Sequence, residues 1–256
     1  MNLILRKISL LHFVLLIANY AIAQETGNEK YDQGVKYYSS GSFKEAADVW
    51  SEIYNTGYRS ASLNYNIANA YFKLQNIPQA ILFYERAYLL DPANEDINYN
   101  LQIARTLIVD RFQAIPELFF VRWFNLISLL LSSNLWAIIS ISAFGFCLIF
   151  LSLYIFSTRY LLKVTGFWLA VLFLFVTGSS MVLSQRNKYL VYDSHKAIIF
   201  SPVVSGKSSP DSSGTDLFVL HEGTKVSIAD EVGEWYEIRL SDGNKGWVPS
   251  NSLNII

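Results

Sequence analysis

Two long stretches without a charged residue constrain this chain more than any other feature. Residues 135–156 and 164–184 contain no Asp, Glu, Lys, Arg or His, and only residues 157–163 separate them. At 1.5 Å per residue, a helix of either length spans about 30 Å, the thickness of the hydrocarbon core of a bilayer. The sequence therefore predicts two antiparallel transmembrane helices joined by a short turn.

The composition supports anchoring rather than transport. The chain is 52% hydrophobic and 16% charged, whereas soluble proteins are about a quarter charged. Ion relays and transport paths usually need ionisable groups inside the membrane, and these spans have none. The net charge of −1 gives no general attraction for nucleic acid. We expect membrane lipid as a partner, and no nucleic acid.

The first residues have the pattern of a secretory signal. Arg6 and Lys7 precede an apolar core at 8–18, and Ala21 and Ala23 supply small residues before a cleavage site. We predict a signal peptide at 1–23. An uncleaved anchor is the alternative, and in either case the segment after it is exported.

Export of the chain from residue 24 onward fixes the expected orientation. The turn at 157–163 would then face the cytoplasm, and its Arg159 and Lys163 agree with the positive-inside tendency. We expect a multi-pass protein of the bacterial cytoplasmic membrane, with both soluble parts on the periplasmic side.

Residues 24–112 contain a repeat of 34 residues, the length of a helical hairpin repeat. Tyr31, Tyr65 and Tyr99 coincide in this register, and the run 64–67 recurs at 98–101. Small residues and aromatics recur at the spacing of the tetratricopeptide repeat family, which this segment resembles; they are Gly34, Tyr37, Ala46, Trp50, Ala68, Tyr71, Ala80, Tyr84 and Ala87, followed by Pro92. We expect repeats at 27–60 and 61–94 and a capping helix at 95–109. Ile53 and Tyr58 depart from the pattern in the first repeat.

The resemblance implies a concave groove lined by the first helix of each repeat. Tyrosine suits peptide binding because it offers contact area with a polar tip. The alternative is that these rings only pack between repeats. The candidate groove residues, carried over by register, are Tyr31, Val35, Tyr38, Tyr65, Asn69, Phe72 and Tyr99.

Residues 113–134 are rich in aromatics but too amphipathic for a third span. We interpret them as a helix lying in the outer membrane interface, where Trp and Phe settle well. Docking on a partner's membrane helix is the other option. Ser132 and its neighbours offer N-cap groups to the first span.

Residues 185–256 read as a small all-β barrel of short strands separated by turn clusters. The expected strands are Lys196–Ser201, Asp216–Leu220, Lys225–Asp230, Trp235–Leu240 and Gly246–Val248. The runs 220–226, 233–240 and 246–249 resemble bacterial SH3 domains, with Gly223 and Gly233 serving turns.

The SH3-like resemblance implies a candidate binding surface at Trp235, Trp247 and Pro249. Eukaryotic SH3 domains place a tyrosine where Ser252 stands here, which weakens the case for proline-rich ligands. Binding of the cell wall stays open. His221 is expected to be a structural turn residue rather than a metal ligand.

No motif for catalysis is found. The sequence has no G-x-S-x-G, no His pair at metal spacing and no phosphate-binding loop. Its single cysteine, Cys147, lies within the first span. We therefore expect no enzymatic activity, no cofactor and no metal.

The order of segments resembles the BatE family of Bat (Bacteroides aerotolerance) operons. The stretch 116–136, with Ser132-Ser133-Asn134-Leu135-Trp136, adds to the likeness. The resemblance implies a scaffold that joins other membrane or periplasmic proteins, among them Bat proteins with von Willebrand A domains, in a complex linked to aerotolerance or stress resistance. An envelope sensor, or a peptidoglycan-binding protein, is the alternative. The expected fold is a multidomain membrane protein with all-α tetratricopeptide hairpins, a transmembrane helical hairpin and a small all-β SH3-like barrel.

Overall fold

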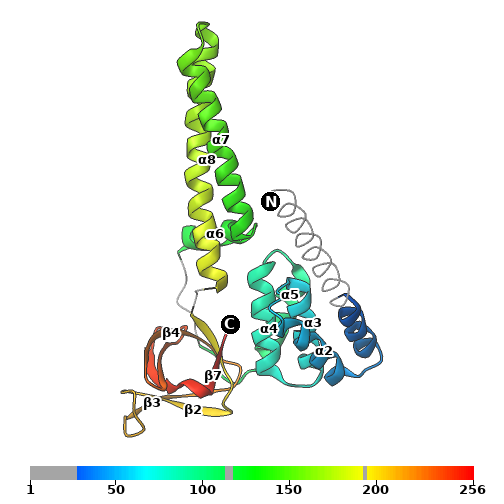
Figure 1. Ribbon diagram of the computed structural model, residues 1–256. Helices are drawn as coiled ribbons and strands as arrows, with labels where there is room; N and C mark the ends of the chain where they lie inside the picture. The colour runs from blue at the N-terminus through cyan, green and yellow to red at the C-terminus, as the bar shows by residue number, and fades with distance from the viewer. Residues whose placement is uncertain (1–27, 113–117, 193–194) are drawn as a thin grey trace, which may run out of the picture.

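The computed structural model describes residues 28–112, 118–192 and 195–256. A repeat domain and a curled sheet lie side by side, and a long helical hairpin stands away from both (Figure 1). The expected fold class is confirmed. The signal peptide predicted at 1–23 lies outside the described residues, as does the first part of the predicted interfacial segment.

The repeat domain is a series of antiparallel helices in which consecutive helices pack together. Three of its helices begin at a side chain that accepts a hydrogen bond from the third backbone N–H further on, namely Ser60, Asn76 and Asn94. Such caps satisfy backbone donors that a helix end leaves unpaired. The helices are residues 28–39, α2 (Phe43–Asn55), α3 (Ala61–Lys73), α4 (Ile77–Leu90) and α5 (Glu95–Thr106).

Small residues allow these helices to approach closely. A Cβ atom on Gly34 would overlap the indole ring of Trp50. That indole is itself buried, and its Nε1–H donates to the carbonyl oxygen of Tyr31 at 3.1 Å. Four alanines of the repeat pattern are fully buried: Ala46, Ala68, Ala80 and Ala87. The small-and-aromatic pattern therefore marks the helix contacts, as a close-packed interior requires.

The hairpin consists of α7 (Ser133–Phe156) and α8 (Tyr160–Tyr192), which pack together along their length. Ser132 caps α7 as expected, accepting a hydrogen bond from the backbone of Leu135. The Ser140 hydroxyl donates across the pair to the carbonyl oxygen of Thr177 at 3.0 Å. The other buried residues at this contact are small: Ala143, Cys147, Gly166, Ala170 and Ser180.

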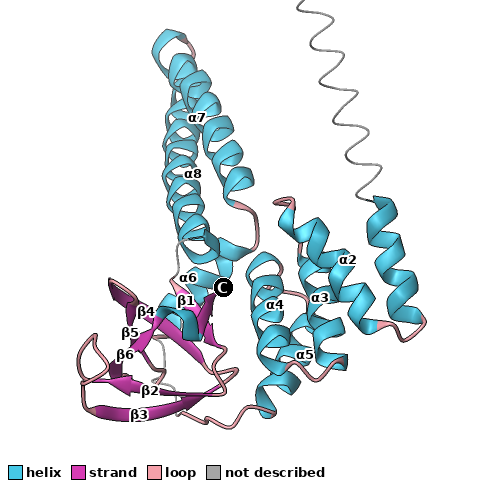
Figure 2. Cartoon of the chain, turned by 60° about the horizontal axis from the view of Figure 1, so that its bottom comes forward, coloured by secondary structure: helices cyan, strands magenta, loops and turns pink. Residues whose placement is uncertain are grey.

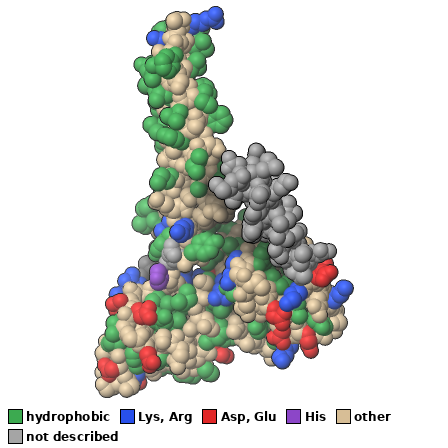
Figure 3. Space-filling view, in the orientation of Figure 1, with side chains coloured by type: hydrophobic (Ala, Val, Ile, Leu, Met, Phe, Trp, Pro, Cys, Tyr) green, Lys and Arg blue, Asp and Glu red, His purple; other side chains and the backbone are tan. Residues whose placement is uncertain are grey.

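Most of the hairpin surface is apolar and uncovered. Only 17% of the most apolar 18-residue stretch of each helix is buried. Figure 3 shows hydrophobic side chains on the surface along the hairpin. The core helix of a soluble protein would be mostly buried, whereas these side chains have no protein to cover them within the described chain. Both helices are long and apolar enough to cross a membrane.

Helix α8 corrects one expected boundary. The C-terminal domain was expected from residue 185, but α8 continues to Tyr192 and the first strand begins at Lys196. The extra turns bury Asn187 and Leu190. The Asn187 amide donates to the carbonyl oxygens of Ser128 and Leu131, both at 3.1 Å, and this packing extends the helix.

The amphipathic segment forms helix α6 (Phe119–Leu129) at the base of the hairpin. The Arg186 Nε–H of α8 donates to the Asn125 side chain at 2.9 Å. On its other face, Phe119 and Trp123 are 77% and 68% exposed. An exposed aromatic face beside two apolar spans fits a helix lying in the membrane interface.

The C-terminal domain is one antiparallel sheet in the order β3-β2-β6-β5-β4-β1-β7. Figure 2 shows its strands in magenta beside the helices of the repeat domain. Its inner side chains, such as Ile199, Leu220, Ile238 and Val248, are fully buried. The strands are β1 (Lys196–Ile199), β2 (Val203–Lys207), β3 (Asp216–His221), β4 (Lys225–Val232), β5 (Trp235–Arg239), β6 (Lys245–Pro249) and β7 (Leu253–Ile255).

Two of these strands, β2 and β7, were not expected. β2 overlaps a Ser- and Gly-containing run between the first two expected strands, where the sequence predicts only turns. A Cβ atom on Gly206 would overlap the ring of Phe218, so glycine here allows an aromatic from β3 to cover the strand. β7 has only three residues, too few for an alternating pattern, and is held by pairing with β1.

Candidate interaction surfaces

The tyrosines of the predicted groove form a hydrogen-bonded series between repeats. The Asn66 amide donates to the hydroxyl oxygen of Tyr31 at 2.7 Å. One repeat later, the Asn100 amide donates to the hydroxyl oxygen of Tyr65 at 2.6 Å. Both tyrosines are partly buried. These two rings therefore take part in the packing between successive helical hairpins.

The remaining candidates differ in exposure. The Tyr84 hydroxyl donates to the side-chain oxygen of Asn69 at 2.6 Å, which fixes the orientation of that amide. Tyr38 lies edge-on to Phe43 with ring centroids 5.1 Å apart, and Phe72 is partly buried. Two candidates are open to solvent: Val35 at 41% and Tyr99 at 68% exposed.

Two tyrosines of this surface, Tyr38 and Tyr84, have raised pKa values. Burial raises the pKa of Tyr84 well above its usual value, and the neighbouring Tyr65 and Tyr38 raise it further. Burial, followed by Tyr65, also raises the pKa of Tyr38. The Tyr38 and Tyr84 hydroxyls therefore stay protonated near neutral pH and act as hydrogen-bonding groups rather than charges.

The hydrogen-bonded series allows a matched test of repeat packing. Tyr65→Phe removes the acceptor of the Asn100 amide and should lower the free energy of unfolding by about 1 kcal/mol. Tyr99→Phe makes the same chemical change one repeat later, at a hydroxyl that is exposed, and should have no measurable effect. Urea unfolding of the two variants checks this, and equal losses would contradict it.

The three candidates on the SH3-like domain share one face of the sheet. Trp235 on β5 pairs with Pro249 on β6, and two residues along, Glu237 pairs with Trp247. Alternate residues of a strand point to the same face. The Trp235, Trp247 and Pro249 side chains are therefore neighbours, and all three are partly exposed. An ion pair between Lys245 and Glu237 at 3.1 Å lies on the same face.

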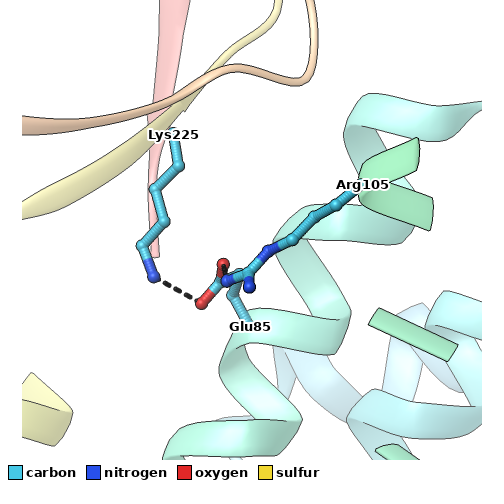
Figure 4. A network of polar contacts seen from close by, with 3 residues as sticks. All are labelled: Glu85, Arg105 and Lys225. Atoms are coloured by element: carbon cyan, nitrogen blue, oxygen red, sulfur yellow. Dashed lines mark hydrogen bonds and ion pairs between the residues drawn. The ribbon is translucent and has the colours of Figure 1, made fainter. Parts of the chain in front are cut away.

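A buried carboxylate joins the two modules. Glu85 on α4 is 1% exposed, and its two oxygens lie 2.5 Å from Arg105 Nη2 on α5 and 2.5 Å from Lys225 Nζ on β4 (Figure 4). Burial alone would raise the pKa of Glu85. The positive charges of Lys225 and Arg105, and their hydrogen bonds, outweigh burial and lower the pKa to about 2.

A second carboxylate, Asp110, ties the segment after the repeats to the turn between β3 and β4. Its Oδ2 accepts hydrogen bonds from the backbone N–H of His221 at 2.7 Å and the hydroxyl of Thr224 at 2.6 Å. Its Oδ1 lies 2.8 Å from Nδ1 of His221. Burial opposes ionisation, but these hydrogen bonds and the His221 side chain lower the pKa of Asp110 below its usual value. His221 thus has a structural role at the junction.

Apolar contacts complete the junction. Ile198 of β1 is fully buried within the apolar cluster of the repeat domain, and Ile256 packs against the same cluster. A Cβ atom on Gly223 would meet the side chain of Ile108, and Gly223 has a φ of +86°, which favours glycine. The two domains therefore pack together into one continuous body.

Sequence reasoning missed this junction. Lys225 stands 140 residues after Glu85, so no local pattern links them. One signal was available: Glu85 lies four residues after Ile81, on the face of α4 that the apolar residues predict to be buried. A charge on the inward face of a helix implies a buried partner, because an unpaired buried charge is costly.

Comparison with known protein families finds a match for each of the two domains. The tetratricopeptide repeat family matches residues 61–94, and the bacterial SH3 domain family matches residues 207–254. The second match begins at the end of β2, so β1 lies outside it. A search of curated proteins finds no match. Modules of these two kinds point to protein–protein interaction or peptidoglycan binding.

Proposed function

We propose that the chain is a non-enzymatic, membrane-anchored scaffold that assembles an envelope protein complex of the Bat type, linked to aerotolerance or stress resistance. One observation carries the scaffold proposal: two interaction modules are fused, through Glu85 and Asp110, into one body at the base of a membrane hairpin. A fused pair presents its two surfaces at a fixed separation and angle, which is what a scaffold needs to orient two partners.

The junction also supports the topology. The two modules contact each other directly, so they must lie on the same side of any membrane that the chain crosses. The chain between them must then cross an even number of times, and α7 with α8 supplies two crossings. With the expected signal at 1–23, that side is the periplasm and the turn at 157–163 is cytoplasmic.

The proposed partners are membrane or periplasmic proteins, among them Bat proteins with von Willebrand A domains. Support comes from the order of segments along the chain and from the exposed groove residues Val35 and Tyr99, which lie at opposite ends of the helical stack. The aromatic face of α6 is available for lipid or for the membrane helices of such partners.

Copurification from the native membrane tests the scaffold. Full-length protein should recover defined membrane partners, and Val35→Glu with Tyr99→Glu should reduce that recovery at least fivefold, because a buried charge at a contact is costly. Tyr58→Glu, at a residue 58% exposed outside the candidate groove, is the matched control. If the unaltered chain recovers no membrane protein, the scaffold proposal is wrong.

Peptidoglycan binding is the second candidate, and the shared face of Trp235, Trp247 and Pro249 favours it. Exposed aromatic rings are suited to stacking on sugar rings. Detergent-solubilised full-length protein should then sediment with purified peptidoglycan, and Trp235→Ser should weaken this. Val219→Ser, at a residue 50% exposed on β3, is the control. If the protein stays in the supernatant, peptidoglycan binding is excluded, and the scaffold proposal is not affected.

A further inference from the structure

A cavity of about 170 Å³ lies where the repeat domain, the end of α8 and the last residues of the chain meet. Arg59 and Arg86 line it from the repeat domain, and Val191 and Tyr192 line it from the final turn of α8. No Asp or Glu side chain is among its lining residues. The volume is far too small for a drug-sized ligand but sufficient for a single anionic group.

The two guanidinium groups both lie near the ring of Tyr54. Their central carbons lie 3.5 Å (Arg59) and 5.3 Å (Arg86) from the centroid of the Tyr54 ring. Arg86 donates to the carbonyl oxygen of Ile255 at 2.6 Å, and Arg59 donates to the carbonyl oxygens of Tyr54 and Tyr58. These neutral acceptors fix the two side chains and leave other N–H groups of each guanidinium unused.

The charge of this pair is not balanced by an acid. Within residues 28–112, 118–192 and 195–256, no carboxylate forms an ion pair with Arg59 or Arg86. Burial lowers the pKa of Arg86 despite the favourable effect of Tyr54, and the positive charge of Arg59 lowers it further. A bound anion would reverse this unfavourable interaction between like charges.

A buried amide adds an independent sign of a ligand. Asn64 lines the same cavity and is 1% exposed, yet neither its side-chain oxygen nor its side-chain nitrogen has a hydrogen-bond partner among the described residues. Native proteins leave few buried polar groups unpaired, and each costs about 1–3 kcal/mol. One cavity is thus lined by an unpaired amide and two guanidinium groups, which are donors of the kind that recognise phosphate oxygens.

We propose that Arg59, Arg86 and Asn64 form a binding site for a phosphate group at the junction of the two modules and the membrane hairpin. The phosphate group could belong to a lipid headgroup or to a soluble ligand. Val191 and Tyr192 follow the apolar part of α8 by only about two turns, roughly 10 Å, so the site lies near the level of lipid headgroups. A free phosphate or phosphate monoester is the other source. The site goes beyond the scaffold proposal and does not depend on it.

Thermal unfolding of the full-length chain in zwitterionic detergent tests the site. One arm adds inorganic phosphate against chloride at equal ionic strength, and the other adds short-chain phosphatidylglycerol against short-chain phosphatidylcholine. We expect a saturable rise of the unfolding temperature in at least one arm. A rise with inorganic phosphate identifies a soluble ligand, and a rise with phosphatidylglycerol alone identifies a lipid headgroup.

Three variants make the result specific. Arg59→Gln should weaken the apparent affinity about tenfold or more, because a hydrogen bond to a charged group is lost. Arg239→Gln removes an exposed arginine on β5 and should bind as the unaltered chain does. Asn64→Leu should raise the unfolding temperature without ligand and still weaken binding. No saturable rise in either arm, or full binding by Arg59→Gln, would overturn the site.

Discussion

Lys225→Met should lower the free energy of unfolding by about 3 kcal/mol and loosen the contact between the two modules. The substitution keeps the aliphatic stem but removes one of the two cations that neutralise the buried Glu85. Removing one partner of a buried ion pair typically costs about 3–5 kcal/mol, because the other charge stays buried. Because Arg105 still pairs with Glu85, we expect a loss at the lower end of this range. Urea unfolding of detergent-solubilised protein measures it.

Two further variants separate this cause from a general effect of losing a lysine. Lys245→Met removes the partner of Glu237, whose side chain is 24% exposed, and should cost less than about 1 kcal/mol. Adding Glu85→Leu to Lys225→Met should recover most of the loss, since Arg105 is 37% exposed and can turn to water. A double variant as unstable as the single one would show that the ion pair is not the reason.

Acid should weaken the same junction, with the largest loss between pH 4.5 and about 2. The pKa of Glu85 is about 2 in the folded chain against its ordinary 4.5. Above pH 4.5 both states are ionised and the full stabilisation is present. As the pH falls, the unfolded chain takes up the proton first, so stability is lost until the folded pKa is passed. The difference corresponds to about 3 kcal/mol, and the lowered pKa of Asp110 acts in the same direction.

The comparison of the unaltered chain with the Glu85→Leu, Lys225→Met variant isolates the contribution of Glu85. Other carboxylates titrate in both proteins and cancel in the difference. As the pH falls through this window, the free energy of unfolding of the unaltered chain, measured with urea, should drop by about 3 kcal/mol relative to that of the double variant. Two curves that stay parallel from pH 6 to pH 2 would contradict the role assigned to Glu85.

Local patterns predicted most elements of this fold, because the pattern and its cause lie within one helix, one strand or one pair of consecutive helices. Gly34 and the buried alanines follow from how closely two neighbouring helices approach. Ser132 could be identified as a helix cap because the cap acts three residues ahead. The alternation at Trp235 and its neighbours follows from strand geometry.

The contacts between elements could not be predicted in the same way. Glu85 and Lys225, or Asp110 and His221, are more than a hundred residues apart, and each residue alone is compatible with a solvated surface. The groove prediction shows the same limit. Tyr31 and Tyr65 fit the register, but the asparagines that donate to their hydroxyls lie 35 residues further along the chain, and both rings are partly buried.

Sidedness rests on the expected export signal together with the junction between the modules. Basic residues flank both ends of the hairpin: Arg159 and Lys163 at the turn, and Arg122, Arg186 and Lys188 at the base. The junction requires both modules to share a compartment, and the proposed export signal at 1–23 would make that compartment the periplasm. A direct measurement of accessibility therefore tests the centre of the account.

Labelling of single cysteines with a membrane-impermeant maleimide provides that measurement, in cells whose outer membrane alone has been opened. Cys147 is first replaced by Ala, and cysteine is then placed at Tyr58, Val219 or Tyr160, which are all at least half exposed in the repeat domain, the sheet and the hairpin turn. Cysteines at 58 and 219 should react in these cells, and cysteine at 160 only after the cytoplasmic membrane is lysed. Labelling at 160 before lysis, or of only one of the two modules, would contradict the account.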